Sequence, residues 1–116
     1  KYFSISLLGS SALTSQTTQM VLQPTDYLFV PKPCENPRAR LVCFPHSGGG
    51  PSAFGAWPEL LDAQQIELVA VCPPGRERRV GQPLVTDWRE LVAAVCQALV
   101  SSGLVDDVPY ALLGHS

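Results

Sequence analysis

Residues 40–50 read Arg-Leu-Val-Cys-Phe-Pro-His-Ser-Gly-Gly-Gly. Its first half, Arg40 to Pro45, is almost wholly apolar, which is typical of a strand in a sheet that is covered on both faces. Its second half, His46 to Gly50, is a glycine-rich loop whose backbone N–H groups can point at an anion. The stretch therefore predicts a buried strand that carries an anion-binding loop at its carboxyl end.

Apolar strands and helical patterns alternate on both sides of this stretch. Further strands are predicted at residues 27–30, 66–72 and 109–113. A first helix is predicted after Pro51 and Ser52 by apolar residues at helical spacing, namely Phe54, Trp57, Leu60 and Leu61. A second helix has Asp87 as its cap, Gly103 at its end and an apolar face made of Trp88, Leu91, Val92, Val95 and Leu99.

This alternation predicts the fold class α/β, with right-handed crossovers and a mostly parallel sheet flanked by helices. The 116 residues suffice for one domain and not for two. Residues 1–19 have no usable periodicity, and Met20 is the only methionine. We therefore expect residues 1–19 to be a non-native or disordered leader, and the domain to occupy residues 20–116.

Composition excludes several classes of function. A net charge of −2 gives no reason to expect nucleic acid or a membrane surface as partner, and no apolar run approaches the roughly 20 residues that span a bilayer. The four cysteines form no C-x-x-C pair, and the two histidines lie at no zinc-ligand spacing from them. We expect buried, reduced thiols in the cytoplasm, with a disulfide framework as the alternative. No metal or organic cofactor is predicted.

Gly114-His115-Ser116 follows directly on the last apolar strand. This is the first half of a nucleophile elbow, G-x-S-x-G, in which small flanking residues let a strained turn present the serine hydroxyl. A plain turn is the alternative reading of these three residues. The glycine-rich loop also has two alternative interpretations, a flexible turn and a phosphate-binding site. The second is disfavoured, because neither G-x-G-x-x-G nor a Gly-Lys-Ser/Thr ending is present.

Three blocks together resemble one family. Residues 41–49 resemble the F-P-x-A-G-G region of type II thioesterases, which edit polyketide and non-ribosomal peptide synthesis. Pro74-Gly75-Arg76-Glu77, with Arg79 and Pro83, is similar to that family's P-G-R-E-x-R-x-x-E-P stretch, which generic esterases and lipases lack. Gly114-His115-Ser116 matches its G-H-S-M-G elbow, and the resemblance extends over residues 27–116.

The resemblance implies the N-terminal half of an α/β-hydrolase that removes acyl groups from the phosphopantetheine arm of an acyl or peptidyl carrier protein. Ser116 would be the nucleophile, and Ser47 would give an oxyanion-hole N–H. Gly114, His115, His46, Gly48 and Gly49 would support the elbow and the loop. In this fold the acid and the histidine follow the nucleophile, so the fragment alone is expected to be inactive.

Two departures from the family pattern bear on these roles. Ser47 replaces the usual alanine, which is harmless if only its N–H acts, and Gln82 replaces a glutamate that would pair with Arg76 or Arg79. Arg76, Arg78 and Arg79 are candidate contacts for an acidic carrier protein, with a merely solvated charge run as the alternative.

Two other functions remain open, and the edge of the sheet is expected to be exposed in the fragment. Another serine α/β-hydrolase, an esterase or lipase, is one alternative, and a non-catalytic remnant is the other. The strand at 109–113, normally central, would end the sheet of the fragment with an unpaired apolar edge that invites aggregation.

Overall fold

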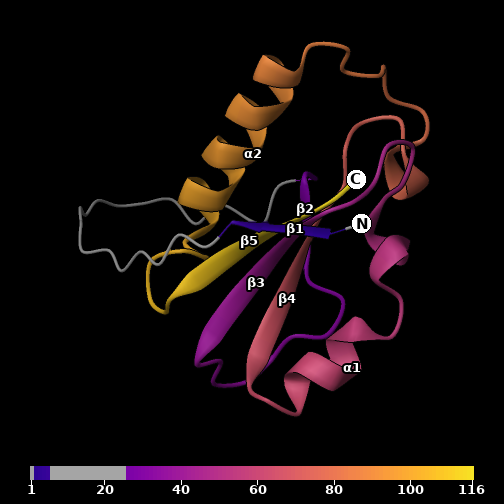
Figure 1. Ribbon diagram of the computed structural model, residues 1–116. Helices are drawn as coiled ribbons and strands as arrows, with labels where there is room; N and C mark the ends of the chain where they lie inside the picture. The colour runs from indigo at the N-terminus through magenta and orange to yellow at the C-terminus, as the bar shows by residue number, and fades with distance from the viewer. Residues whose placement is uncertain (1, 6–25) are drawn as a thin grey trace.

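The computed structural model describes residues 2–5 and 26–116, which form a five-stranded sheet with helical segments packed against it (Figure 1). The strands are β1 (Tyr2–Ile5), β2 (Leu28–Phe29), β3 (Ala39–Phe44), β4 (Ile66–Val71) and β5 (Tyr110–His115). The α-helices are α1 (Trp57–Asp62) and α2 (Trp88–Ser102), and two 3-10 turns are η1 (Pro51–Phe54) and η2 (Glu77–Arg79). The expected α/β class is confirmed.

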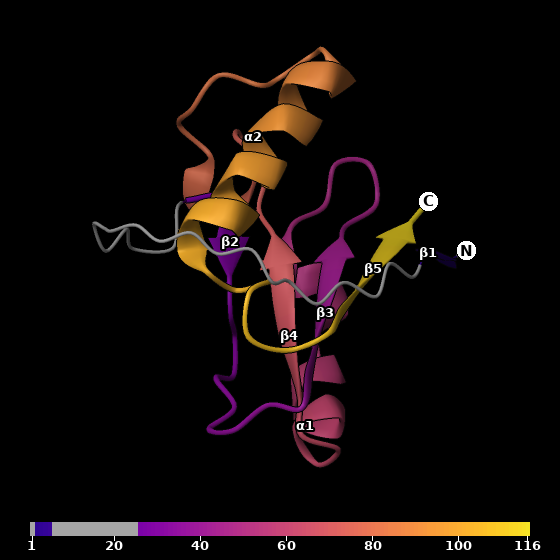
Figure 2. The same cartoon turned by 90° about the vertical axis from the view of Figure 1, so that its left-hand side faces the viewer.

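The centre of the sheet is parallel and its edges are antiparallel. The strand order is β1-β5-β3-β4-β2, in which β3 pairs in parallel with both β5 and β4. Figure 2 shows β3, β4 and β5 running in one direction and β2 in the other. The crossovers from β3 to β4 and from β4 to β5 contain the helices, as the alternating pattern predicts.

Both faces of the central strands are covered, because successive side chains in a strand point to opposite faces. Val42 of β3 and Val69 of β4 belong to a core cluster with residues of α2. Their neighbours Cys43 and Leu68 belong to a second cluster, which contains Phe54 of η1 and packs against Trp57 of α1. The continuous apolar strands of the sequence are therefore explained by two cores on either side of one sheet.

The first helix differs from its prediction. A single helix was expected from the spacing of Phe54, Trp57, Leu60 and Leu61, but Gly55 at φ +23° separates η1 from α1. Leu60 is 68% exposed, whereas Phe54 is fully buried. The helical spacing therefore matched two short segments with different directions, and the glycine between them was the missed signal.

The second helix has the predicted ends but a different buried face. The Asp87 side chain accepts a hydrogen bond from the N–H of Arg89, and Gly103 ends the helix at φ +76°. Trp88 and Val92 were expected in the core, yet they are 67% and 46% exposed. The buried residues of α2 are Val95, Ala98 and Leu99, so the helix is rotated relative to the predicted face.

The edge of β5 is not open. Strand β1 pairs with β5 in antiparallel register, with Phe3 opposite Gly114 and Ser4 opposite Leu113. The unpaired edge expected at this strand is therefore absent, and residues 2–5 have a structure that the predicted leader did not include. The rest of that leader, and Met20, lie outside the described residues.

A network of charged side chains connects the amino-terminal ends of β3 and β4 with the segment before β5. The Arg40 guanidinium lies 2.7 Å from the Glu67 carboxylate and 2.6 Å from that of Asp107, and it also donates to the carbonyl of Leu104. Glu67 in turn accepts from the N–H of Cys34. Arg40 and Glu67 are directly opposite each other in the β3–β4 register, and both side chains are nearly buried.

The cysteines are all unpaired, but not all are buried. Cys43 and Cys72 have no exposed surface, and burial raises the pKa of the Cys43 thiol to about 12. Cys34 is half-buried, and Cys96 is exposed on α2. The expectation of buried thiols is therefore correct for the two strand-associated cysteines and wrong for Cys96, because α2 turns that side away from the sheet.

The Glu67→Ala substitution should lower the free energy of unfolding by about 1.5–3 kcal/mol, because it removes the buried carboxylate that bonds the Arg40 guanidinium, which keeps Asp107 as a partner. Urea denaturation followed by circular dichroism measures this change. The exposed Glu35 provides the control, and Glu35→Ala should change stability by less than about 0.5 kcal/mol. A loss below 1 kcal/mol for Glu67→Ala would contradict a stabilising role of the network.

Candidate active site

The register of β3 and β5 brings two predicted site segments to one edge of the sheet. Phe44, the last residue of β3, is paired with Gly114 in β5. The chain continues beyond these two positions into the loop at His46–Gly50 and into Ser116 (Figure 2). In open α/β sheets, ligands bind outside the carboxyl ends of the parallel strands.

Ser116 is exposed at the end of β5. The strand includes Gly114 and His115, so it extends two residues further than predicted and leads directly to the serine. Gly114 lies between Phe44 of β3 and Phe3 of β1 in the sheet. A strand that leads directly to the serine is part of the context that a nucleophile elbow requires.

The loop after β3 is a tight turn built around its glycines. The N–H of Gly49 donates to the carbonyl of His46 at 2.9 Å, and Gly48 adopts φ +82°, a conformation that favours glycine. A Cβ on Gly49 would lie 2.8 Å from the His46 ring, so glycine lets the imidazole fold over the loop. His46 Nδ1 donates to the carbonyl of Ser47 at 2.9 Å, so the ring is hydrogen-bonded to its own loop.

His46 also contacts His115, the residue before Ser116. Its ring lies edge-on to the ring of His115, with 5.1 Å between the ring centres and 81° between the planes. Burial lowers the pKa of His115, and the neighbouring His46 lowers it further. The two histidines therefore link the loop to the end of β5, and the shift favours an uncharged His115 at neutral pH.

Arg79 is part of the interior. It is 7% exposed, its Nη1 donates to the carbonyl of Cys72, and its guanidinium carbon lies 4.2 Å from the centre of the Tyr27 ring. Nε and Nη2 both donate to Oε1 of Gln82, at 3.0 and 2.7 Å. The prediction that Arg79 contacts a partner is therefore wrong, and the amide of Gln82 keeps the contact that a glutamate would make.

The other two arginines differ from Arg79 and from each other. Arg78 is exposed, donates to the carbonyls of Asp26 and Leu28, and lies over the ring of Phe29. Arg76 is half-buried, and within residues 2–5 and 26–116 its guanidinium makes no hydrogen bond or ion pair. Of the three predicted contacts, Arg76 is the one whose charge is not already used inside the described chain.

Glu77 was not among the predicted site residues. Its carboxylate accepts hydrogen bonds from both the N–H and the hydroxyl of Ser52, which follows the glycine-rich loop by two residues. The signal was present in the sequence, since Glu77 belongs to the Pro74–Glu77 block. Periodicity and spacing did not indicate that this block touches the loop after β3.

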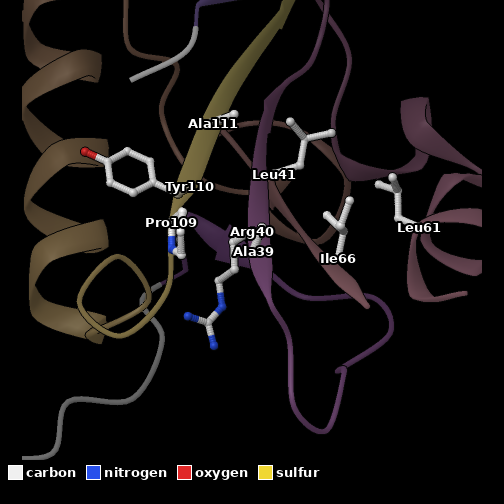
Figure 3. A pocket seen from close by; sticks show the side chains of 8 residues that line it. All are labelled: Ala39, Arg40, Leu41, Leu61, Ile66, Pro109, Tyr110 and Ala111. Carbon is white, nitrogen blue, oxygen red and sulfur yellow. The ribbon is translucent and has the colours of Figure 1, made fainter. Parts of the chain in front are cut away.

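An apolar pocket lies at the opposite end of the sheet (Figure 3). Its lining includes Leu41, Leu61 and Ile66 on the α1 side, together with Pro109 and Ala111 at the start of β5. The strands separate this pocket from Ser116 by about five residues, which is roughly 17 Å at the usual rise per residue. It is therefore not the place where Ser116 would meet a substrate.

Neither a metal cluster nor a membrane span is found in the described residues. Residues 2–5 and 26–116 contain no group of three or more His, Cys, Asp or Glu side chains that could hold a metal ion. Among the same residues, no helix is both long enough and apolar enough to cross a membrane.

Comparisons with known proteins identify the family. The family model described as the thioesterase domain matches residues 39–116. The chain is 40% identical over 88 residues to the human S-acyl fatty acid synthase thioesterase, medium chain, covering 71% of this chain and 31% of that protein. It is 34% identical over 79 residues to the gramicidin S biosynthesis protein GrsT of Aneurinibacillus migulanus, covering 68% and 29%.

A solved structure has the same fold. The type II thioesterase BorB from the borrelidin biosynthetic cluster superimposes with a TM-score of 0.66 at 24% identity, over 82% of this chain and 37% of BorB. The fold is thus that of an α/β-hydrolase. The chain belongs to the thioesterase domain family, and it spans about a third of the length of the human and Aneurinibacillus relatives.

The lowered pKa of His115 predicts a dependence of stability on pH. Between the folded-state pKa and the ordinary value of 6.5, the unfolded chain binds more protons than the folded one, so stability falls as the pH drops through this range. Denaturation at pH 7.5 and 5.5 should show a loss that is smaller in His115→Asn. An imidazole of His115 that titrates at or above 6.5 by NMR would contradict this.

Proposed function

We propose that this chain carries the nucleophile and part of the oxyanion hole of an enzyme that hydrolyses acyl thioesters. The observation that carries the proposal is the pairing of Phe44 with Gly114, which sets the glycine-rich loop beside Ser116. Membership of the thioesterase domain family supports the reaction class. The chain spans about a third of the length of the human and Aneurinibacillus relatives, so the activity of the whole enzyme is part of the proposal.

The reaction follows from the chemistry of serine. The Ser116 hydroxyl adds to the thioester carbonyl carbon as a base removes its proton, and the carbon–sulfur bond of the tetrahedral intermediate then breaks. The thiol leaves with a proton, and the acyl group remains on Ser116 as an ester. Water repeats the sequence at this ester, which releases the carboxylic acid and restores the hydroxyl.

The intermediate needs hydrogen-bond donors for its oxyanion. We assign one donor to the backbone N–H of Ser47, in the turn that His46 and Gly49 shape. In α/β-hydrolases the second donor is the N–H of the residue after the nucleophile. Loss of one such donor costs about 100- to 1000-fold in rate.

The base is not one of the two histidines. His115 precedes the nucleophile within β5, and the His46 ring is engaged with its own loop. In this fold the acid and the catalytic histidine follow the nucleophile along the chain. We therefore propose that the polypeptide of residues 1–116 by itself does not turn over thioesters, because a serine hydroxyl without its base is a weak nucleophile.

The substrate that we propose is an acyl group on the phosphopantetheine arm of an acyl or peptidyl carrier protein. The names of the relatives support this, since they come from fatty acid synthase and from a peptide antibiotic system. Arg76 is the candidate contact for the carrier's acidic surface or phosphate, because an arginine forms strong paired hydrogen bonds with such groups. Buried, reduced Cys43 and Cys72 support our placement of the protein in the cytoplasm.

The Ser116→Ala substitution should abolish hydrolysis of octanoyl-pantetheine by the full-length product of the gene that encodes this chain. The rate constant is expected to fall by about 10⁴-fold or more, because the acyl-enzyme cannot form. Parallel assays with a p-nitrophenyl ester separate a thioesterase from a general esterase. Sequencing the transcript beyond Ser116 shows whether an acid and a histidine follow.

Each other outcome has a defined meaning for the proposal. Hydrolysis of the oxygen ester alone would identify a different serine hydrolase. Thioesterase activity that survives in Ser116→Ala would refute the assignment of the nucleophile. A product that ends at Ser116 and is inactive would be the non-catalytic remnant.

The Arg76→Ala substitution should raise KM for an acyl carrier protein substrate by about 5- to 10-fold and leave KM for octanoyl-pantetheine unchanged. The charge of Arg76 would act only on the carrier, which the small thioester lacks. Arg79→Ala is the contrasting variant, since it removes an interior contact and should reduce stability instead of carrier affinity. Equal effects of Arg76→Ala on both substrates would exclude a docking role.

A further inference from the structure

The first turn after the glycine-rich loop lacks a cap of its own. Gly50 is the N-cap residue of η1 and has no side chain, and Pro51 has no N–H. The N–H of Ala53 donates to the carbonyl of Gly50, which leaves Ser52 as the first amide of the turn that needs an acceptor from elsewhere. Side-chain oxygens of the N-cap residue usually fill this position.

Glu77 provides that acceptor from the other crossover of the sheet. Its Oε2 accepts from the N–H of Ser52 at 3.1 Å, and its Oε1 lies 3.3 Å from the same nitrogen. The hydroxyl of Ser52 donates to Oε2 as well. A carboxylate that accepts from a backbone N–H at a helix start makes a charge-assisted hydrogen bond, which is stronger than a neutral one.

Two further features of the chain favour the approach of the Glu77 carboxylate to the start of η1. A Cβ on Gly50 would lie 2.7 Å from Cδ and 2.8 Å from Oε2 of Glu77, so only glycine admits the carboxylate there. Glu77 itself has φ +42°, a left-handed backbone that is uncommon outside glycine. Backbone of this kind persists where the surrounding structure requires it, and it is common at functional sites.

Arg79 anchors the turn from which Glu77 reaches the loop. The N–H of Gly75 donates to the carbonyl of Arg79, and the Arg79 guanidinium is fastened to Cys72 and Gln82. Glu77 therefore projects from a turn that is held against the end of β4. The His46–Gly50 loop therefore lies between the end of β3 and Ser52, which is hydrogen-bonded to the Glu77 carboxylate.

We propose that Glu77 is a positioning residue for the reaction at Ser116. Its carboxylate holds Ser52, two residues after Gly50, and thereby sets the Ser47 N–H where the oxyanion forms. The proposal rests on the function proposed above and deepens it, since it gives the Pro74–Glu77 block a role at the oxyanion loop. A displacement of about 1 Å in such a site is enough to cost roughly 100-fold in rate.

The test compares Glu77→Ala and Gly50→Ala, singly and together, in the full-length gene product. Gly50 has φ −149°, so alanine fits the backbone there and acts by displacing the Glu77 carboxylate. Each single variant should lower kcat for octanoyl-pantetheine by about 10- to 100-fold with KM within about twofold. The kcat of the double variant should lie within about twofold of the kcat of the less active single variant, because both substitutions break the same contact.

Matched controls and a second readout keep the test independent of folding. Glu35→Ala and Gly81→Ala alter an exposed glutamate and a glycine whose Cβ would meet nothing within 4 Å, and both should behave like the wild type. Hydrogen exchange of the peptide covering residues 48–54 should accelerate in Glu77→Ala and Gly50→Ala. Glu77→Gln keeps an acceptor oxygen for Ser52 and should recover kcat to within about fivefold of the wild type.

The failures of the two proposals are distinguishable. Unchanged exchange at residues 48–54, or an unchanged kcat in both single variants, overturns the role of Glu77 while thioesterase activity stands. Additive losses in the double variant overturn it as well, since they would come from independent effects. Absence of any Ser116-dependent hydrolysis in the wild type defeats the proposed function, and the positioning role falls with it.

Discussion

The parallel pairing of β3 with β5 fixes the geometry of the candidate active site. It fixes Phe44 opposite Gly114, so that whatever follows the two strands emerges at one edge of the sheet. A shift of the register by one residue would exchange the two faces of β5 and move its apolar side chains out of their cores. The cores on both faces therefore specify the same register that aligns the loop with Ser116.

The residues between β4 and α2 serve this edge in two ways. Arg79 is buried and closes the turn against the end of β4, and Glu77 reaches from that turn to the start of η1. In the basic run at 76–79, Arg79 is therefore buried and Arg78 is exposed, and the Glu77 carboxylate accepts hydrogen bonds from Ser52. Only Arg76 keeps a charge that no described residue uses.

Local signals predicted the elements well where one cause dominated. The apolar stretch at 40–45, the Asp87 cap and the Gly103 end correspond to elements of the structure, because strand burial and helix capping are short-range effects. Prediction was wrong where two causes competed. Spacing suggested one helix across Gly55, and the apolar Trp88 and Val92 suggested a buried face that the packing of α2 does not use.

The order and type of neighbouring residues were enough to predict the α/β class and the family, and they suggest the roles proposed for Ser116 and Ser47. The buried position of Arg79, the pairing of β1 with β5 and the contact of Glu77 with Ser52 emerge only in the folded chain. Each of these joins segments 7 to more than 100 positions apart, by packing and hydrogen bonds that leave no periodic trace in the sequence. Long-range contacts of this kind arise only once the sheet has brought its loops together.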